Sequence, residues 1–262
     1  MARMSKRLAP STKRRKTRSA QRGGAQTIIA DGGVNYQGAD VLLLNNYHGT
    51  PTIVVFRSTL TAGPLPAFGL AGGRCEVKHH GLIENTITEE LYEESRKSVF
   101  IDHEVFMLMT NDDKYVDIAP GPIFVGGPDQ MRRAYVCAGN FSTTIYNENK
   151  SIFDRLIAQD PANKARYHSY LETSEMFRIP IADMEAAIVR PPARGKPMRV
   201  HGRDIYVQQG VFNAYIAAKA KNLIANPFDL LAAPIKWSEP ANGLTVRDRR
   251  GLTTGRVDSY YL

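Results

Sequence analysis

Four glutamates in the middle of the chain form its densest group of acidic side chains, within residues 89–94, Glu-Glu-Leu-Tyr-Glu-Glu. In an α-helix each residue advances by about 100°, so Glu90, Glu93 and Glu94 would project from one face within roughly one turn. Like charges on one face repel, and a helix tolerates them most readily where cations lie beside them. Carboxylate oxygens suit Mg²⁺ or Mn²⁺, which also bind substrate phosphates. The pattern favours a divalent-metal site, although solvated helix faces often carry similar acidic runs.

A glycine-rich segment, residues 68–73 with the sequence Phe-Gly-Leu-Ala-Gly-Gly, precedes these acids. Between the two, Ile83, Ile87 and Leu91 recur at every fourth position, which predicts a helix over residues 82–98 with an apolar stripe beside its acidic face. Such a helix would hold its carboxylates close to the glycine loop.

The order of these features resembles the signature of the Nudix hydrolases, G-x5-E-x7-R-E-U-x-E-E-x-G-U, in which U is a bulky aliphatic residue. Gly73 matches the opening glycine, and Glu76 matches a glutamate often found three residues later. The helical core E-U-x-E-E is matched by Glu90, Leu91, Glu93 and Glu94. Residues 172–180 resemble the family's late loop and strand, so the resemblance covers roughly residues 38–190.

The match has departures. The interval between Gly73 and the helical acids is about two residues longer than in the signature, an expansion expected within residues 78–81. Glu89 replaces the signature's Arg, Arg96 replaces its late Gly, Lys97 takes its last aliphatic place, and its middle Glu is missing. In the family that Arg and that Glu brace each other. Losing both leaves no unpaired buried charge, which is less damaging than losing one.

The resemblance implies an α+β fold, a Nudix-like α/β/α sandwich with a mixed sheet. It also implies hydrolysis of a pyrophosphate bridge in a nucleoside diphosphate-linked substrate. The Gly73 carbonyl with Glu90, Glu93 and Glu94 would hold Mg²⁺ or Mn²⁺, so Glu93 and Glu94 also count as catalytic. A further carboxylate must orient or deprotonate the attacking water, and we expect Glu175 first and Glu172 second.

Three basic residues near the glycine loop are candidates for binding substrate phosphate. Arg74 directly follows the loop, and His79 and His80 lie in the expanded segment. A histidine pair without metal-ligand spacing is more often an ordinary surface feature, and that alternative stays open.

The positive charge of the chain is concentrated at its N-terminus. Nine of the 34 lysines and arginines fall in residues 1–24, which leaves 25 bases to 26 acids elsewhere. This segment has few apolar residues, so we expect a disordered arm that binds a polyanion, serves as a nuclear import signal or only aids solubility. The arm residues that carry this expectation are Lys6, Arg7, Lys13, Arg14, Arg15, Lys16 and Arg18.

Around the acids, residues 39–45 and 52–57 predict a strand hairpin, and 104–109, 114–118, 123–125, 133–141 and 176–179 further strands. Helices are expected at 150–172, 181–189 and 208–223, with Pro161 interrupting the first and a strand or hairpin at 198–207. The predicted organisation is a basic arm at 1–37, a hydrolase domain at 38–225 and an irregular extension at 226–262.

Composition excludes several classes of protein. The two cysteines, Cys75 and Cys137, cannot make a disulfide framework or a four-cysteine metal site. No stretch reaches the roughly 18 apolar residues of a membrane span, so we expect an intracellular protein, cytoplasmic or nuclear, with no membrane partner. Family members are often dimers, which makes a homodimer an open expectation.

Three functions stay open from the sequence. The arm together with a pyrophosphatase-like core suggests capped RNA as substrate, as in the mRNA-decapping branch of the family. The alternatives are a small-nucleotide pyrophosphatase acting on ADP-ribose, a nucleotide sugar or a dinucleoside polyphosphate, and a catalytically silent module that binds nucleotide or RNA.

Overall fold

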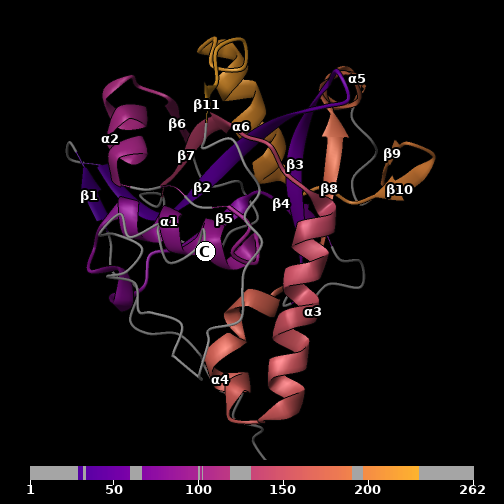
Figure 1. Cartoon of the computed structure of the whole chain (residues 1–262). Coiled ribbons are helices and arrows are strands. Elements are labelled where there is room, and N and C mark those ends of the chain that lie inside the picture. The colour runs from indigo at the N-terminus through magenta and orange to yellow at the C-terminus, as the bar shows by residue number, and fades with distance from the viewer. Residues whose placement is uncertain are drawn as a thin grey trace, which may run out of the picture.

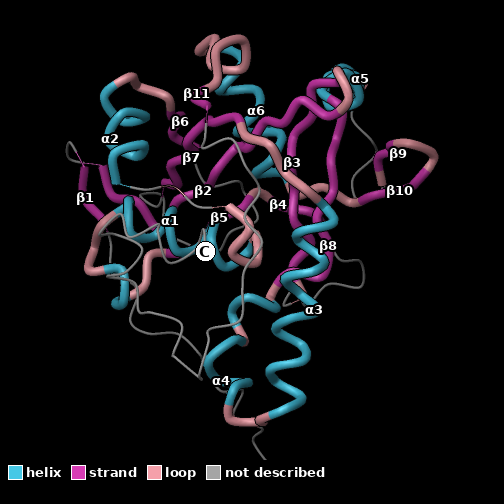
Figure 2. The backbone as a smooth tube through the Cα atoms, viewed as in Figure 1, coloured by secondary structure: helices cyan, strands magenta, loops and turns pink. Residues whose placement is uncertain are grey.

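The computed structural model of the protein describes residues 29–31, 34–59, 67–99, 101, 103–118, 131–190 and 197–229 (Figures 1 and 2). Strand β1 (Ile29–Asp31) and the start of β2 (Val34–Tyr47) fall inside the range expected for the arm, so the sheet begins before residue 38. The basic residues of the arm, the strand expected at 123–125 and most of the C-terminal extension lie outside the described residues, and the expectations about them stay predictions.

Strand β2 is the centre of the sheet and has partners along both edges. On one edge it runs parallel to β7 (Met131–Ala138). On the other edge, β3 (Thr50–Ser58) and β5 (Ala71–Arg74) are both antiparallel to it, and β3 pairs with residues 43–47 while β5 pairs with residues 38–41. The glycine-rich loop is therefore fixed to the middle strand of the sheet.

Shorter strands extend the sheet beyond these partners. β3 pairs antiparallel with β4 (Phe68–Gly69) and β8 (Thr173–Pro180). β7 pairs antiparallel with β6 (Tyr115–Ile118) and parallel with β11 (Phe228–Asp229). Together with β1, the described residues form a mixed sheet of nine strands.

The turn between β2 and β3 is shorter than the sequence predicts. Tyr47 pairs directly with Thr50, so only His48 and Gly49 form the loop. Both have positive φ, 49° and 80°, as a two-residue hairpin with a primed turn requires. The two strands extend right up to this turn.

Helices cover both faces of the sheet, and two short 3₁₀ turns and a small β-ribbon complete the described elements (Figure 1). The helices are α1 (Ile83–Glu94), α2 (His103–Asn111), α3 (Thr143–Gln159), α4 (Asn163–Tyr167), α5 (Ile181–Val189) and α6 (Gln209–Ala220). The other elements are η1 (Val77–His79), η2 (Ser169–Leu171), β9 (Met198–Val200) and β10 (Arg203–Ile205).

Successive residues of the strands belong to opposite faces, which gives two separate cores. On one face Leu43 packs with residues of α1 and α2 such as Ile87 and Phe106. On the other, Leu42 packs with residues of α5 and α6 such as Met184. The prediction of an α+β protein with an α/β/α sandwich and a mixed sheet is confirmed.

Three predicted elements differ from the structure. Residues 104–109, expected as a strand, lie in α2, because Phe106 and Met109 bury at helical spacing and the run does not alternate with polar residues. The helix expected at 150–172 begins earlier, as α3, where Ser142 caps it, and it ends before Pro161. The helix expected at 82–98 ends at Glu94.

A third, smaller core lies under the projecting part of the molecule. Ile152 and Phe153 of α3 pack with Tyr167 of α4, and α3 and α4 extend away from the sheet in Figures 1 and 2. η2 follows α4 and leads back to β8, close to the C-terminal half of α1. Within the described residues, no helix is both long and apolar enough to cross a membrane.

Candidate active site

Strand β5 and helix α1 touch through a glycine and a glutamate. A Cβ atom added to Gly73 would lie 2.1 Å from the Glu90 carboxyl carbon, far closer than two carbon atoms can approach. The Glu90 carboxylate thus occupies the space that any side chain at position 73 would need. The structure brings together these two predicted metal ligands, which are 17 positions apart in the sequence.

Glu94 reaches the same loop one residue earlier. Its Oε2 atom accepts a hydrogen bond from the Gly72 amide at 2.9 Å. Gly72 has a φ of 150°, and a Cβ there would meet the backbone and side chain of Asp40. The glycine pair therefore lets the helix carboxylates approach the backbone of β5.

The three predicted metal-binding glutamates lie in surroundings that disfavour their charge. Burial raises the pKa of Glu90 to about 8, and the nearby charge of Glu93 adds to this. Burial raises the pKa of Glu93 to about 7, opposed by the cation of Lys78. The pKa of Glu94 is also well above its ordinary value, through burial and then the charge of Glu90. A bound cation would relieve this clustering of negative charge.

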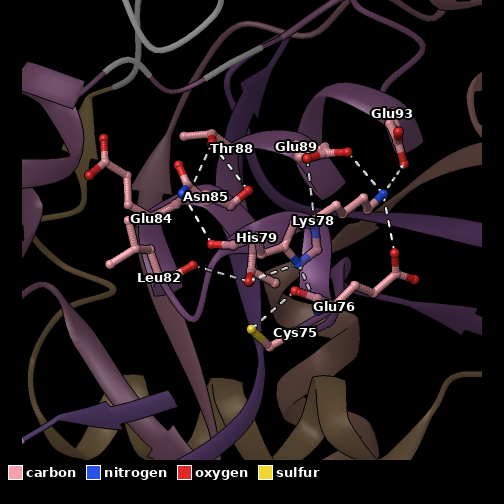
Figure 3. A network of polar contacts seen from close by, with 11 residues as sticks. Cys75, Glu76, Lys78, His79, Leu82, Glu84, Asn85, Thr88, Glu89 and Glu93 are labelled. Atoms are coloured by element: carbon pink, nitrogen blue, oxygen red, sulfur yellow. Dashed lines mark hydrogen bonds and ion pairs between the residues drawn. The ribbon is translucent and has the colours of Figure 1, made fainter. Parts of the chain in front are cut away.

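One lysine already lies among the acids, as Figure 3 shows. The Lys78 ammonium is 2.9 Å from Glu89 Oε1, 3.5 Å from Glu76 Oε2 and 3.9 Å from Glu93 Oε2. Burial acts to lower the pKa of Lys78, but the charges of Glu93 and its other acidic neighbours outweigh it and the net shift is upward. This role was not predicted, because in the sequence Lys78 is only part of an expanded loop.

An arginine from β7 lies on the other side of the site. Arg132 donates two hydrogen bonds to the Asp40 carboxylate and one, of 3.1 Å, to the Gly73 carbonyl. This is the carbonyl that the resemblance makes a metal ligand, and a carbonyl oxygen can accept more than one contact. Arg132 is 59 residues from Gly73 in sequence, so no local motif could have revealed it.

The two candidates for the catalytic base differ in their surroundings. Glu93 accepts a hydrogen bond from the Ser169 side chain in η2 and is influenced by the charge of Glu172, which directly follows η2. Glu175 instead holds Arg203 through both carboxylate oxygens and contacts Arg57 at 3.5 Å. Glu175 is therefore held by two arginines, while Glu172 influences Glu93 through its charge, and the choice between them stays a prediction.

The three predicted phosphate-binding residues differ in their exposure to solvent. His79 is fully buried, which argues against the expected contact with substrate. Arg74, at the end of β5, and His80, directly after η1, are exposed. These two remain available to a ligand that approaches the glycine loop.

The C-terminal end of α1 explains one departure from the signature. Arg96 stands at the signature's late glycine and has a φ of 54°, a left-handed conformation that glycine adopts at least cost. Its guanidinium is buried over the Tyr146 ring, at 3.8 Å from the centroid, and donates to the Thr173 carbonyl. The left-handed conformation therefore belongs to a residue whose side chain packs on α3 and hydrogen-bonds to the first residue of β8.

The donor atoms fit a divalent cation in type, although they are not arranged as a ready-made cage. Among the described residues, no three acidic, histidine or cysteine side chains converge as a metal site. Mg²⁺ commonly binds one or two protein carboxylates and keeps several waters, so a complete protein cage is not required. Glu90 and Glu93, half-buried and beside each other on α1, supply oxygens of the right kind.

Comparison with known proteins gives similar structures only. No protein-family model and no curated protein matches the chain. One similar structure is the NUDIX domain of Shewanella oneidensis NrtR complexed with ADP ribose, with 10% identity over 71% of this chain and 86% of that one and a TM-score of 0.37.

Two further structures are similar over most of their length. A C. elegans Ap4A hydrolase in a binary complex has 11% identity over 70% of this chain and 97% of that one, with a TM-score of 0.35. The M. smegmatis Nudix hydrolase RenU has 7% identity over 77% and 97%, with a TM-score of 0.37. The chemistry of the site rests on the signature residues and their contacts.

Proposed function

We propose that the protein is a divalent-metal-dependent hydrolase that cleaves a pyrophosphate linkage in a nucleoside diphosphate-linked substrate. The observation that carries this proposal is the packing of the Glu90 carboxylate against Gly73. It joins the two halves of the sequence signature, and Glu94 adds a second contact through the Gly72 amide. Mg²⁺ or Mn²⁺, bound by Glu90, Glu93 and Glu94, would neutralise phosphate charge and activate water.

The protein's own residues would each contribute a definite part of the reaction. Arg132 would hold the backbone of the glycine-rich segment in place, because it donates hydrogen bonds to both the Gly73 carbonyl and the Asp40 carboxylate. Arg74, exposed at the end of the loop, would contact a substrate phosphate. Because the carboxylates are half-buried, they would attract a divalent cation more strongly than they would in open water.

Glu172 is the better candidate for orienting or deprotonating the attacking water. It follows η2 directly, and its charge acts on Glu93. Its Oε1 atom lies 3.2 Å from His168 Nδ1, which forms an ion pair with it when the imidazole is protonated. Glu175 would need to leave Arg203 and Arg57 to serve the same purpose.

For the substrate, capped RNA and free nucleotides remain the two forms of this proposal. Capped RNA is supported by the concentration of positive charge in residues 1–24, which could bind the RNA body. ADP-ribose, a nucleotide sugar or a dinucleoside polyphosphate would need only the core.

A catalytically silent module that binds nucleotide or RNA is the second candidate function. The observation in its favour is Lys78, whose ammonium already contacts Glu89 and approaches Glu93. An internal cation in that place reduces the need for a metal ion.

Hydrolysis measured with Mg²⁺ and then Mn²⁺ tests the proposal. The substrates are cap-labelled RNA, free cap dinucleotide, ADP-ribose and diadenosine polyphosphates. The variants are Glu93→Gln combined with Glu94→Gln, and Glu104→Gln as a matched control on exposed α2. We expect metal-dependent turnover that the double variant loses, by about 100-fold or more, and that the control retains.

The outcomes separate the two candidate functions. No turnover of any substrate by the folded, metal-loaded protein would overturn the hydrolase and favour the silent module. Turnover that does not need a divalent ion, or that survives in the double variant, would contradict the role of the acids on α1.

A further inference from the structure

The 3₁₀ turn η1 is held in place by its last residue, His79. The Glu76 amide, just before the turn, donates a hydrogen bond of 3.0 Å to His79 Nδ1. The Thr86 hydroxyl of α1 lies 3.1 Å from the same nitrogen. The imidazole is completely buried between the turn and the helix.

These contacts decide which ring nitrogen carries the proton. A backbone amide can only donate, so His79 Nδ1 must be the acceptor nitrogen and carry no hydrogen. In the neutral ring the proton is then on Nε2. That nitrogen lies 3.6 Å from Glu89 Oε2 of α1, a close contact that is longer than an ordinary hydrogen bond (Figure 3).

Two consecutive residues of η1, Lys78 and His79, contact the Glu89 carboxylate. Its Oε1 atom contacts Lys78 at 2.9 Å, while Oε2 faces His79. Only 15% of the Glu89 side chain is exposed, so these contacts lie in a partly dry environment where they are stronger than in water. Glu89 directly precedes Glu90, whose carboxylate has almost no free space beside Gly73.

We propose that His79 is a positioning residue, which through Glu89 fixes the rotation of α1 and so directs Glu90 and Glu93 toward the cation. This inference rests on the proposed function for its consequence, but its contacts are independent of a metal ion. His79 is the sixth residue after Gly73, the place of the signature's middle glutamate, and Glu89 takes the place of its arginine. In the signature the glutamate is in the loop and the arginine is on the helix, whereas here the basic residue, His79, is in the loop and the acid, Glu89, is on the helix.

Two substitutions of His79 separate this role from simple support of the turn. Asparagine places its oxygen where Nδ1 was, so His79→Asn keeps the acceptor for the Glu76 amide and loses the donor toward Glu89. Glutamine reaches to the place of Nε2, so His79→Gln keeps a donor toward Glu89. We expect His79→Asn to weaken Mn²⁺ binding by about tenfold, and His79→Gln to stay within about twofold of wild type.

A second pair of variants tests whether the effect passes through Glu89. Glu89→Ala alone should weaken Mn²⁺ binding to a similar extent, and adding His79→Asn to it should have little further effect. Mn²⁺ binding is measured by titration calorimetry on the full chain, and circular dichroism checks that each variant folds. Additive losses in the double variant would overturn the proposal, because the two residues would then act separately.

The thermal midpoint of the metal-free protein provides a readout that does not need the proposed function. We expect His79→Asn to lower it more than His79→Gln, again without additivity with Glu89→Ala. The reverse order would show that His79 only supports the turn and would overturn the inference. If wild type binds no Mn²⁺, the proposed function fails, while these midpoints still decide the role of His79.

Discussion

Glu90 depends on the absence of a side chain at position 73, and this is the sharpest constraint among the individual residues. The carboxylate lies where a Cβ would be. Neither group can move easily, since Gly73 is fixed to β2 through its pairing with Ala39 and Glu90 is part of α1. The sequence signature predicted that both residues matter, and the structure gives the steric reason.

Gly73→Ala should therefore displace Glu90 and weaken both the fold and cation binding. We expect a loss of about 1–3 kcal/mol in the free energy of unfolding, as for other overpacked sites. Gly210→Ala is the matched control, because a Cβ at this position of α6 meets nothing within 4 Å. The control should be neutral or stabilising by up to about 1 kcal/mol. Urea unfolding of both variants measures the difference, and equal stabilities would contradict the packing described.

The raised pKa values of Glu90 and Glu93 predict how stability depends on pH. Both groups keep protons in the folded state that the unfolded chain releases above pH 4.5. Folding stability should therefore fall as the pH rises from 4.5, until the folded protein releases these protons near pH 7 for Glu93 and pH 8 for Glu90. Burial lowers the pKa of Lys97 to about 7, and this group favours folding only at higher pH. Histidines also titrate between pH 5 and 7, so the share of the glutamates is obtained as the difference between wild type and a glutamate variant.

Thermal unfolding without divalent ions, measured from pH 5 to 7, should give midpoints that decrease with pH. Glu90→Gln should make this decrease shallower, because one raised carboxyl is removed, and Glu104→Gln, an exposed residue of α2, should not change it. Added Mg²⁺ should stabilise wild type more at pH 7 than at pH 5, since it binds the ionised acids. The same pH dependence in wild type and Glu90→Gln would contradict the assignment.

The partners of these acids show where residue-level prediction stops. Spacing on one helix was enough to group Glu90, Glu93 and Glu94. It could not reveal Lys78 as their neighbour, since that contact depends on how η1 folds back onto α1. His79 was expected at the surface because histidine pairs usually lie there. Its ring is instead buried, with a hydrogen bond from the Glu76 amide that no sequence pattern indicates.

Among the elements, α3 carries the part of the molecule that projects from the sheet. Its first turn has one clear capping contact, in which Ser142 Oγ accepts a hydrogen bond from the Ile145 amide at 3.2 Å. Ser142→Ala should cost about 1 kcal/mol of folding stability. Ser151→Ala is the control, because that hydroxyl is exposed and donates a hydrogen bond to the Asn147 carbonyl of the same helix. Denaturant midpoints compare the two, and an equal effect would show that the cap is unimportant.

Prediction at this scale succeeded where period and length agreed. The strands of the first hairpin and helices α1, α5 and α6 were expected near their observed positions. Segment 104–109 was predicted wrongly because a short, wholly apolar run has no clear period, and its helical form is set by packing on β7. The early end of α1 depends on the burial of Arg96 and Lys97, two residues whose types normally continue a helix.

At the scale of the whole molecule, the layers of the fold and the strand order of the sheet differ in how far the sequence predicts them. The two-faced core could be predicted as an α/β/α sandwich from the order of the elements and the resemblance. The sheet's strand order could not, because it depends on long-range pairs such as β2 with β7. The excess charge in residues 1–24 falls outside the residues that the structure describes, and its role stays a prediction.

Deleting residues 2–24 should weaken binding to single-stranded RNA and reduce its dependence on salt. Every arm cation that no longer neutralises a phosphate should lower the slope of affinity against salt concentration by about one increment, up to about nine for the full arm. Hydrolysis of ADP-ribose or cap dinucleotide should be unchanged. Fluorescence anisotropy at several salt concentrations measures the slope, with Lys13, Arg14, Arg15 and Lys16 all changed to Gln as an equal-length control. Identical slopes for wild type and the deletion would exclude the arm.

The pairing of β2 also limits how this protein can change in length during evolution. Residues 38–41 of β2 pair with β5, and the same stretch pairs with β7 on its other edge. Gain or loss of a single residue there would turn every following side chain to the opposite face, exchanging Leu42 and Leu43 between the two cores. Descendants of this sequence should therefore vary in length at the hairpin turn and around η1, while β2 keeps its residue count.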